Sequence, residues 1–262
     1  MKKSIVTNNC RVFYDFIPNE NKPTVVLLHG YGINLKLWQP QLDFLSDKCT
    51  VINIDIRGHG QSRPCNTFSI KEAASDLRNI LSAENAEDAI LIGLSMGGYI
   101  IQEYAFSYGG ASGYMIAGST PILLPCYSKW EKFVLSHSAG MMRFYPWTFM
   151  KNEMTKSCAV TEQARALIRP LFDEMTKNEF IQFWNGIATC LHEEQMQFDA
   201  PLLVICGEND KTGSIKKCMK FWESGYKNCE VKILANAGHV ANLDAADEFN
   251  KIMTSFIHDC IK

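Results

Sequence analysis

Short apolar runs alternate with amphipathic stretches along most of the chain. Each run is long enough for one strand, and several are apolar throughout, which is typical of strands buried on both faces. The alternation with helical stretches predicts an α/β protein with a mostly parallel sheet covered on both sides. The expected strands are residues 4–16 (one or two strands), 24–28, 51–55, 89–92, 113–117, 202–206 and 231–234.

Apolar residues at helical spacing predict three helices between and after these strands. They cover residues 70–81, the segment from about residue 96 to Tyr108, and residues 249–257 at the end of the chain. Ser69 is the expected N-cap of the first helix, with Glu72 three residues later as its capping-box partner.

Residues 121–197 break this alternation. They contain no convincing strand run, but they are rich in methionine and aromatic residues at helical spacing. We therefore expect a helical cap at 121–197, inserted into a core formed by residues 1–120 and 198–262. Most of its large apolar side chains are expected to form the cap's own core. The candidates to line a substrate pocket are Trp130, Met142, Phe144, Tyr145 and Trp147.

Composition narrows the possible partners. Of 262 residues, 47% are hydrophobic and 21% are charged, and the formal net charge is −2. This balance gives no electrostatic reason to expect nucleic acid or an anionic membrane surface. No stretch approaches the roughly 20 apolar residues of a membrane span. The ten cysteines show no C-x-x-C spacing, so we expect free thiols, no metal and a cytoplasmic, soluble protein.

Gly93, Ser95 and Gly97 form the pattern G-x-S-x-G between a predicted strand and a predicted helix. A sharp strand-to-helix turn of this kind exposes a serine hydroxyl above the sheet and needs glycines where the backbone is crowded. The helix N-terminus also favours developing negative charge. We therefore expect Ser95 to be a nucleophile.

A serine nucleophile needs a base, and the base needs a carboxylate to orient it. Asp210 follows the strand at 202–206, and His239 follows the strand at 231–234. The predicted triad is Ser95, Asp210 and His239, in the chain order found on this type of sheet. Glu208 remains an alternative acid. His137 and His192 lie in the predicted cap and could contact substrate.

The reaction also requires donors for an oxyanion. The backbone N–H of Met96 follows the nucleophile, and the N–H of Tyr31 lies in the glycine-rich loop after the strand at 24–28. We expect these two amides to form the oxyanion hole, with His29 bracing the loop.

Five motifs occur in order along the chain: H-G-Y-G at 29–32 with Trp38 after it, D-I-R-G-H-G-Q-S at 55–62, G-L-S-M-G-G at 93–98, G-E-N-D at 207–210 and G-H at 238–239. Together they resemble the α/β-hydrolase superfamily, in its branch of small single-domain esterases, lactonases and C–C hydrolases. The resemblance implies an eight-stranded, mostly parallel sheet, a helical cap and an acyl-enzyme mechanism without a cofactor. The 55–62 motif is expected to be a structural turn, with no catalytic role for Arg57 or His59.

The apolar cap favours a small, moderately hydrophobic substrate, and we expect a carboxylic ester or lactone. Arg143 is the one cap residue considered for binding a substrate carboxylate. C–C bond hydrolysis and another acyl transfer remain alternatives on the same triad. A ligand sensor that retains the triad but turns over slowly is an alternative of a different class, because fold alone does not determine function.

Overall fold

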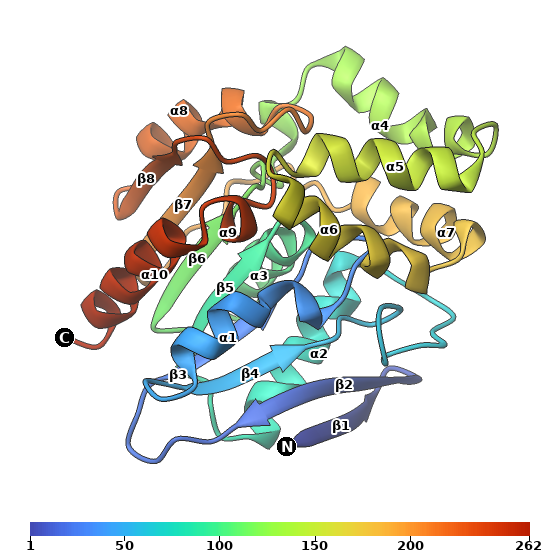
Figure 1. Cartoon of the computed structure of the whole chain (residues 1–262). Helices are drawn as coiled ribbons and strands as arrows, with labels where there is room; N and C mark the ends of the chain where they lie inside the picture. Colours follow the sequence, from blue (N-terminus) through green and yellow to red (C-terminus); the bar gives the residue numbers. More distant parts are fainter.

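One eight-stranded sheet organises the chain, which the computed structural model describes from residue 1 to residue 262. The strand order is β1-β2-β4-β3-β5-β6-β7-β8, and every pair from β4 to β8 is parallel (Figure 1). The predicted α/β fold class is therefore confirmed. The strands are β1 (Lys2–Thr7), β2 (Cys10–Ile17), β3 (Thr24–Leu28), β4 (Thr50–Ile54), β5 (Ile90–Leu94), β6 (Gly113–Ala117), β7 (Leu202–Gly207) and β8 (Cys229–Leu234).

The N-terminal segment forms an antiparallel hairpin at one edge of the sheet. β1 pairs with β2, and β2 pairs antiparallel with β4. Asn8 and Asn9 form the turn with φ values of 45° and 58°. Asparagine tolerates this left-handed conformation, and two such residues suit the tightest hairpin turn. The segment predicted as one or two strands is thus two.

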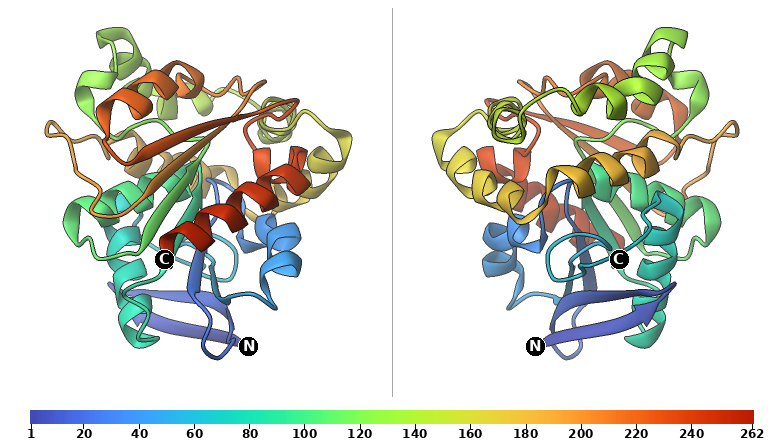
Figure 2. Two further views of the ribbon diagram at one scale, coloured as in Figure 1. Left: turned by 90° about the vertical axis from the view of Figure 1, so that its left-hand side faces the viewer. Right: turned by 90° about the vertical axis from the view of Figure 1, so that its right-hand side faces the viewer.

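Helices cover both faces of the sheet (Figure 2). One face carries α2 (Ile70–Ala83), α3 (Met96–Ser107) and α8 (Ile215–Gly225), and the other carries α1 (Gln39–Leu45), α9 (Ala241–Asp244) and α10 (Ala246–Cys260). The buried side chains of β3 alternate between two cores, because successive residues of a strand point to opposite faces. Val26 and Leu28 pack in the first core, and Val25 and Leu27 pack in the second.

Four helices lie between β6 and β7 in the chain, above the sheet in Figure 1: α4 (Lys129–Met142), α5 (Trp147–Cys158), α6 (Glu162–Leu171) and α7 (Lys177–Ala188). Short 3-10 helices, η2 (Leu124–Cys126) and η3 (Phe172–Glu174), accompany them, as η1 (Leu35–Trp38) precedes α1. The two ends of this insertion are tied together, since the Leu124 amide donates to the His192 carbonyl at 2.7 Å. The division into a core and a cap at 121–197 remains our interpretation of this arrangement.

The start of α2 differs in detail from the prediction. The Ser69 hydroxyl accepts from the Glu72 amide, as expected for an N-cap. However, the Glu72 carboxylate contacts the side chains of Ser69, Thr67 and Arg57, and not the Ser69 amide. The capping box is therefore incomplete, because other partners engage the carboxylate.

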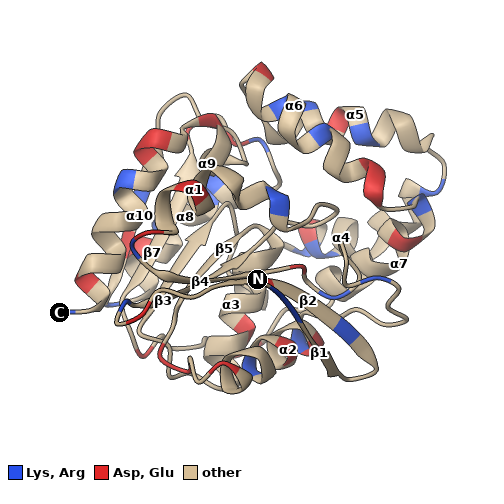
Figure 3. Ribbon diagram, turned by 60° about the horizontal axis from the view of Figure 1, so that its bottom comes forward, with Lys and Arg blue, Asp and Glu red and all other residues tan.

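Charged residues of both signs are interspersed over the elements visible in Figure 3. Two lysine or arginine pairs link the core to the insertion: Arg63 lies 2.9 Å from Glu179 of α7, and Lys36 lies 3.0 Å from Glu174 of η3. None of the helices combines the length and the apolar character that crossing a membrane requires.

Candidate active site

Ser95 occupies the turn between β5 and α3 in a strained backbone conformation. Its φ is 54°, and every other non-glycine residue with a positive φ is an asparagine. A serine rarely adopts this conformation, and such outliers persist only where surrounding contacts hold them. Here the Ser95 amide donates to the Ala117 carbonyl at 2.8 Å, and the Ser95 carbonyl accepts from the Ser119 hydroxyl at 2.7 Å.

The glycines beside Ser95 are required by close backbone contact. A Cβ on Gly93 would lie 2.4 Å from the Gly97 carbonyl carbon, and one on Gly97 would lie 2.2 Å from the Leu28 carbonyl oxygen. Both neighbours are backbone atoms that cannot rotate away. Only glycine therefore lets α3 begin directly against β3 and β5, which places Ser95 at the carboxyl edge of the sheet.

Asp210 and His239 meet at the same edge, from the loops after β7 and β8. His239 Nδ1 lies 3.0 Å from Asp210 Oδ2, and both side chains are buried. The two loops are in direct contact, because the Asn209 amide donates to the Ala237 carbonyl at 2.8 Å. A Cβ on Gly207 would lie only 2.1 Å from the Gly238 carbonyl oxygen. The sheet therefore brings together two residues that are 29 positions apart in the chain.

The environment keeps Asp210 ionised. Burial opposes its charge, but the hydrogen bonds from His239 and the Thr212 amide outweigh this effect and hold the pKa of Asp210 below its ordinary value. Glu208, the alternative acid, is exposed and accepts from the Asn236 amide at 3.2 Å. The carboxylate that accepts a hydrogen bond from His239 is therefore that of Asp210 and not that of Glu208.

His29 and Arg57, from the motifs at 29–32 and 55–62, have structural partners of their own. His29 is buried, its Nε2 accepts from the Ile56 amide at 3.0 Å, and its Nδ1 contacts the Gly30 carbonyl oxygen at 2.7 Å. Burial lowers the pKa of His29 to about 4, so the ring is neutral and braces the loop after β3. Arg57 is buried against Asp76, which its Nε contacts at 2.6 Å.

The cap histidines that we considered for substrate contact are also engaged elsewhere. His192 Nε2 lies 2.6 Å from Glu103 Oε2. His137 is exposed, and its ring stacks on Phe133. Two large cavities, described below, meet at Ser95, and neither histidine lines them.

The amides of Tyr31 and Met96 are free donors beside Ser95. A Cβ on Gly30, the residue before Tyr31, would lie 3.6 Å from the Ser95 Cβ, and Met96 is the first residue of α3. Neither amide donates a hydrogen bond within the protein, as expected for a helix N-terminus and an open loop. The Tyr31 side chain turns toward α7, where its hydroxyl donates to the Phe180 carbonyl oxygen and its ring packs 4.6 Å from that of Phe180.

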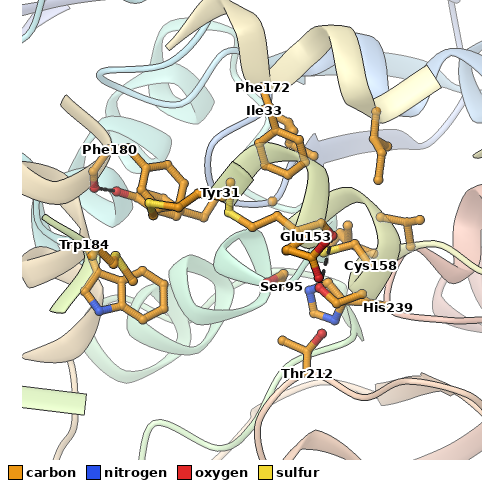
Figure 4. A pocket seen from close by; sticks show the side chains of 18 of the residues that line it. Tyr31, Ile33, Ser95, Glu153, Cys158, Phe172, Phe180, Trp184, Thr212 and His239 are labelled. Carbon is orange, nitrogen blue, oxygen red and sulfur yellow. Dashed lines mark hydrogen bonds between the residues drawn. The ribbon is translucent and has the colours of Figure 1, made fainter. Parts of the chain in front are cut away.

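Two cavities of similar size meet at Ser95. The first, called here the His239 cavity, has a volume of about 390 Å³ and is lined by Ser95, His239 and side chains of α5 and α7 (Figure 4). The second, called the Tyr99 cavity, has a volume of about 380 Å³ and lies between α3, α4 and the loop after Asp210. Both are lined mostly by apolar residues, and they share Tyr31, Ser95, Trp184 and Thr212.

Neither cavity is lined by a lysine or an arginine. The one acidic residue that lines the His239 cavity is Glu153, and the one that lines the Tyr99 cavity is Glu131. Arg143, considered above for binding a carboxylate, lines neither of them. No group of three His, Cys, Asp or Glu side chains is arranged to hold a metal ion.

The predicted pocket residues divide into two groups. Met142 and Tyr145 line the His239 cavity, and Trp130 lines the rim of the Tyr99 cavity. The prediction was wrong for Phe144 and Trp147, which line neither cavity. Phe144 follows the end of α4 and is 89% exposed. Trp147 packs on Phe180 with ring centres 5.1 Å apart and donates from Nε1 to the Met175 carbonyl, so it belongs to the packing of the insertion.

Sequence reasoning also missed several lining residues. Phe180 and Trp184 are four positions apart on α7 and face both Tyr31 and the His239 cavity. Their helical spacing was visible, but nothing local showed which face of α7 turns toward Ser95. Thr212 follows Asp210 by two positions, which was the only available signal for it. The hydroxyl residues Tyr99, Thr120 and Tyr127 of the Tyr99 cavity were not predicted either.

Comparison with known proteins finds relatives that span most of the chain. The chain is 21% identical over 261 residues to 3-oxoadipate enol-lactonase 2 of Acinetobacter baylyi. This alignment covers 95% of this chain and 94% of that protein. It is 26% identical over 256 residues to monoacylglycerol lipase abhd6-B of Xenopus laevis, covering 90% of this chain and 76% of that protein. A thermophilic esterase from Thermogutta terrifontis has the same fold, with a TM-score of 0.83, 18% identity and 99% of each chain covered.

These relatives act on different substrates, so similarity to them leaves the substrate open. The family model described as "Alpha/beta hydrolase family" matches residues 25–252, which include every strand from β4 to β8 and all three residues Ser95, Asp210 and His239. The chain belongs to the alpha/beta hydrolase family.

Proposed function

We propose that this protein is a serine hydrolase that cleaves a neutral carboxylic ester or lactone through Ser95, His239 and Asp210. The observation that carries the proposal is the strained Ser95 at the junction of two apolar cavities, one of which also contains His239 bound to Asp210. A strained serine above a sheet edge, next to a carboxylate-bound imidazole, is the arrangement required for nucleophilic attack on a carbonyl carbon.

The proposed reaction has two halves. His239 accepts the Ser95 proton as the hydroxyl attacks the carbonyl carbon, and the Tyr31 and Met96 amides stabilise the oxyanion. The tetrahedral intermediate then collapses, and His239 protonates the departing alcohol to leave an acyl-enzyme. Water, activated by the same histidine, releases the acid and restores Ser95. Asp210 stabilises the imidazolium that forms in each half.

The lining of the cavities supports a neutral substrate. Burying a carboxylate without a cationic partner is costly, and Glu131 and Glu153 would repel it. The apolar walls stabilise hydrocarbon groups on both sides of the scissile bond by about 25 cal/mol per Å² removed from water. An ester with an apolar group on each side therefore fits better than an anionic lactone.

Steady-state hydrolysis of p-nitrophenyl alkanoates from two to ten carbons, with a lactone in parallel, tests the proposal. Ser95→Ala removes the nucleophile, so we expect kcat to fall by roughly 10⁵- to 10⁶-fold. Ser255→Ala, on the exposed face of α10, is the matched control and should behave as the wild type.

Turnover that persists in Ser95→Ala would show that hydrolysis does not use this site. Absence of Ser95-dependent turnover on every ester and on the lactone, from folded protein, would overturn the assignment of ester or lactone substrates.

A further inference from the structure

The Tyr99 cavity contains a cluster of three hydroxyl groups among its apolar walls. Tyr99 comes from α3, Thr120 follows β6, and Tyr127 follows η2. Thr120 Oγ1 lies 2.9 Å from the Tyr99 hydroxyl oxygen and 2.5 Å from that of Tyr127. Burial raises the pKa of the Tyr99 hydroxyl to about 12, so the group keeps its proton near neutral pH.

A count of protons shows that this cluster has one hydrogen-bond donor to spare. Each hydroxyl has one proton to donate, so the three groups have three protons. The two contacts within the cluster use two of them, and no other acceptor in the protein takes a proton from these hydroxyls. One O–H donor therefore remains, although which oxygen carries it depends on how the two contacts are oriented. A donor left without a partner in a buried site costs free energy until an acceptor binds.

The position of His239 indicates which half of the substrate enters this cavity. His239 must reach the leaving oxygen, and it lines only the His239 cavity. Met96, whose amide faces the carbonyl oxygen in the proposed reaction, lines only the Tyr99 cavity. The leaving alcohol therefore belongs in the His239 cavity, and the acyl group belongs in the Tyr99 cavity.

The negative charge of Glu131 restricts which hydrogen-bond acceptor an acyl group in the Tyr99 cavity can carry. Glu131 lines the Tyr99 cavity, and hydrogen bonds from the hydroxyls of Ser214 and Ser128 lower its pKa to about 2. This carboxylate is ionised at every relevant pH, and no cation lines the cavity to offset it. A carboxylate on the acyl group would be repelled, whereas a neutral oxygen would not.

We propose that the Tyr99 cavity selects acyl groups that carry a neutral oxygen acceptor, such as a ketone, bound by the free O–H of the Tyr99–Thr120–Tyr127 cluster. This inference rests on the proposed ester hydrolysis and adds the substrate class. The apolar walls hold the methylene chain between the scissile carbonyl and the ketone. An acyl group without the ketone fills the same space but leaves the donor unpaired.

Matched pairs of p-nitrophenyl esters test this selection. The 4-oxopentanoyl, 5-oxohexanoyl and 6-oxoheptanoyl esters are compared with the pentanoyl, hexanoyl and heptanoyl esters. Each kcat/KM is divided by the rate constant for hydroxide-catalysed hydrolysis of the same ester, because a nearby ketone alters intrinsic reactivity. We expect a preference of roughly 2- to 12-fold for the keto ester at one chain length, the range of one net neutral hydrogen bond.

Removal of the hydroxyls tests whether the cluster causes the preference for keto esters. By the same count, one free O–H remains in Tyr99→Phe, in Tyr127→Phe and in the double variant, so all three hydroxyls have to be removed. The preference, measured as the ratio of kcat/KM values within each matched pair, should disappear in the triple variant Tyr99→Phe/Thr120→Val/Tyr127→Phe. Tyr108→Phe, at the exposed end of α3, is the matched control and should keep the wild-type preference. Thermal unfolding of each variant separates a loss of selectivity from a loss of structure.

The outcomes distinguish the two proposals. Ser95-dependent hydrolysis of all six esters without any keto preference would overturn this inference and leave the proposed function intact. A preference that survives in the triple variant would also overturn it, since another group would then bind the ketone. No Ser95-dependent hydrolysis of any ester would overturn the proposed function and this inference together.

Discussion

At the scale of single residues, the site depends on contacts that leave little freedom. Ser95 is held at a positive φ by the Ala117 carbonyl and the Ser119 hydroxyl, and His239 is held by Asp210. A base that is hydrogen-bonded at Nδ1 presents Nε2 for proton transfer. Asp210 thus determines both the tautomer and the orientation of His239.

Exchange of the acid tests this role. Asp210→Asn keeps the shape of the side chain but removes the negative charge that stabilises the imidazolium. We expect kcat on the best ester to fall by roughly 10⁴-fold. Glu208→Gln, two residues earlier and exposed, should retain wild-type kinetics. If instead Glu208→Gln abolished activity and Asp210→Asn did not, the acid would have to be reassigned.

At the scale of elements, the carboxyl ends of parallel strands carry the site. Because β5, β7 and β8 run in parallel, the residues that follow them meet at one edge of the sheet. The loops after β7 and β8 also touch, with Gly207 directly against the Gly238 carbonyl. The position of His239 therefore depends on close packing of two loops as well as on its hydrogen bond.

A methyl group at Gly207 should displace the His239 loop. Its Cβ would lie 2.1 Å from a backbone oxygen, so the loop would have to move. A misplacement of about 1 Å costs on the order of 10² in rate. We expect kcat/KM to fall by about 10²-fold for Gly207→Ala, measured on the best ester alongside a thermal melt.

The matched control is Gly140→Ala within α4. Beyond the adjacent residues and the backbone of α4 itself, no atom lies within 4 Å of a Cβ at this position. Alanine favours helix over glycine by about 1 kcal/mol, so this variant should be equally or more stable and fully active. Wild-type activity in Gly207→Ala would show that the loop contact does not position His239.

The predicted strand boundaries matched the structure closely where a strand is packed on both faces of the sheet. The runs at 24–28 and 113–117 became β3 and β6 with the same bounds, because every side chain in them is at least partly buried. α8 was not predicted, although Ile215, Cys218, Met219 and Trp222 are buried at helical spacing. α1 has only seven residues, too few for a reliable periodic pattern.

At the scale of the whole molecule, two buried histidines link stability to pH. Burial lowers the pKa of His29 to about 4 and that of His59 to about 3, from an ordinary value of 6.5. Between pH 6.5 and about 4, the unfolded chain binds protons at these residues and the folded chain does not. Protonation therefore favours the unfolded state, and stability falls as pH falls through this range.

Urea unfolding between pH 7.5 and 5.0 measures this effect, above the range in which most carboxylates titrate. We expect the free energy of unfolding to decrease toward pH 5, with a slope of up to about 1.4 kcal/mol per pH unit for each histidine. A free energy of unfolding that is independent of pH in this range would contradict the neutral, buried state of His29 and His59.

The sequence by itself determined the fold class, the order of the strands along the chain and the positions of Ser95, Asp210 and His239 relative to strand ends. These features are local: apolar runs define buried strands, and crowded turns need glycine at particular positions such as Gly93 and Gly97. Parallel pairing then requires that residues at successive carboxyl ends share one edge, so the candidate site could be predicted without knowing any distance.

Only the tertiary structure decided what surrounds that site. Met142, Phe144 and Tyr145 are neighbours in the chain, yet the first and third line the His239 cavity and Phe144 points into solvent. The hydroxyl cluster joins Tyr99, Thr120 and Tyr127 from α3 and from segments on either side of η2. Residue type and spacing do not encode such choices, because they depend on how α4–α7 pack over the sheet edge and on which face of each helix that packing turns inward.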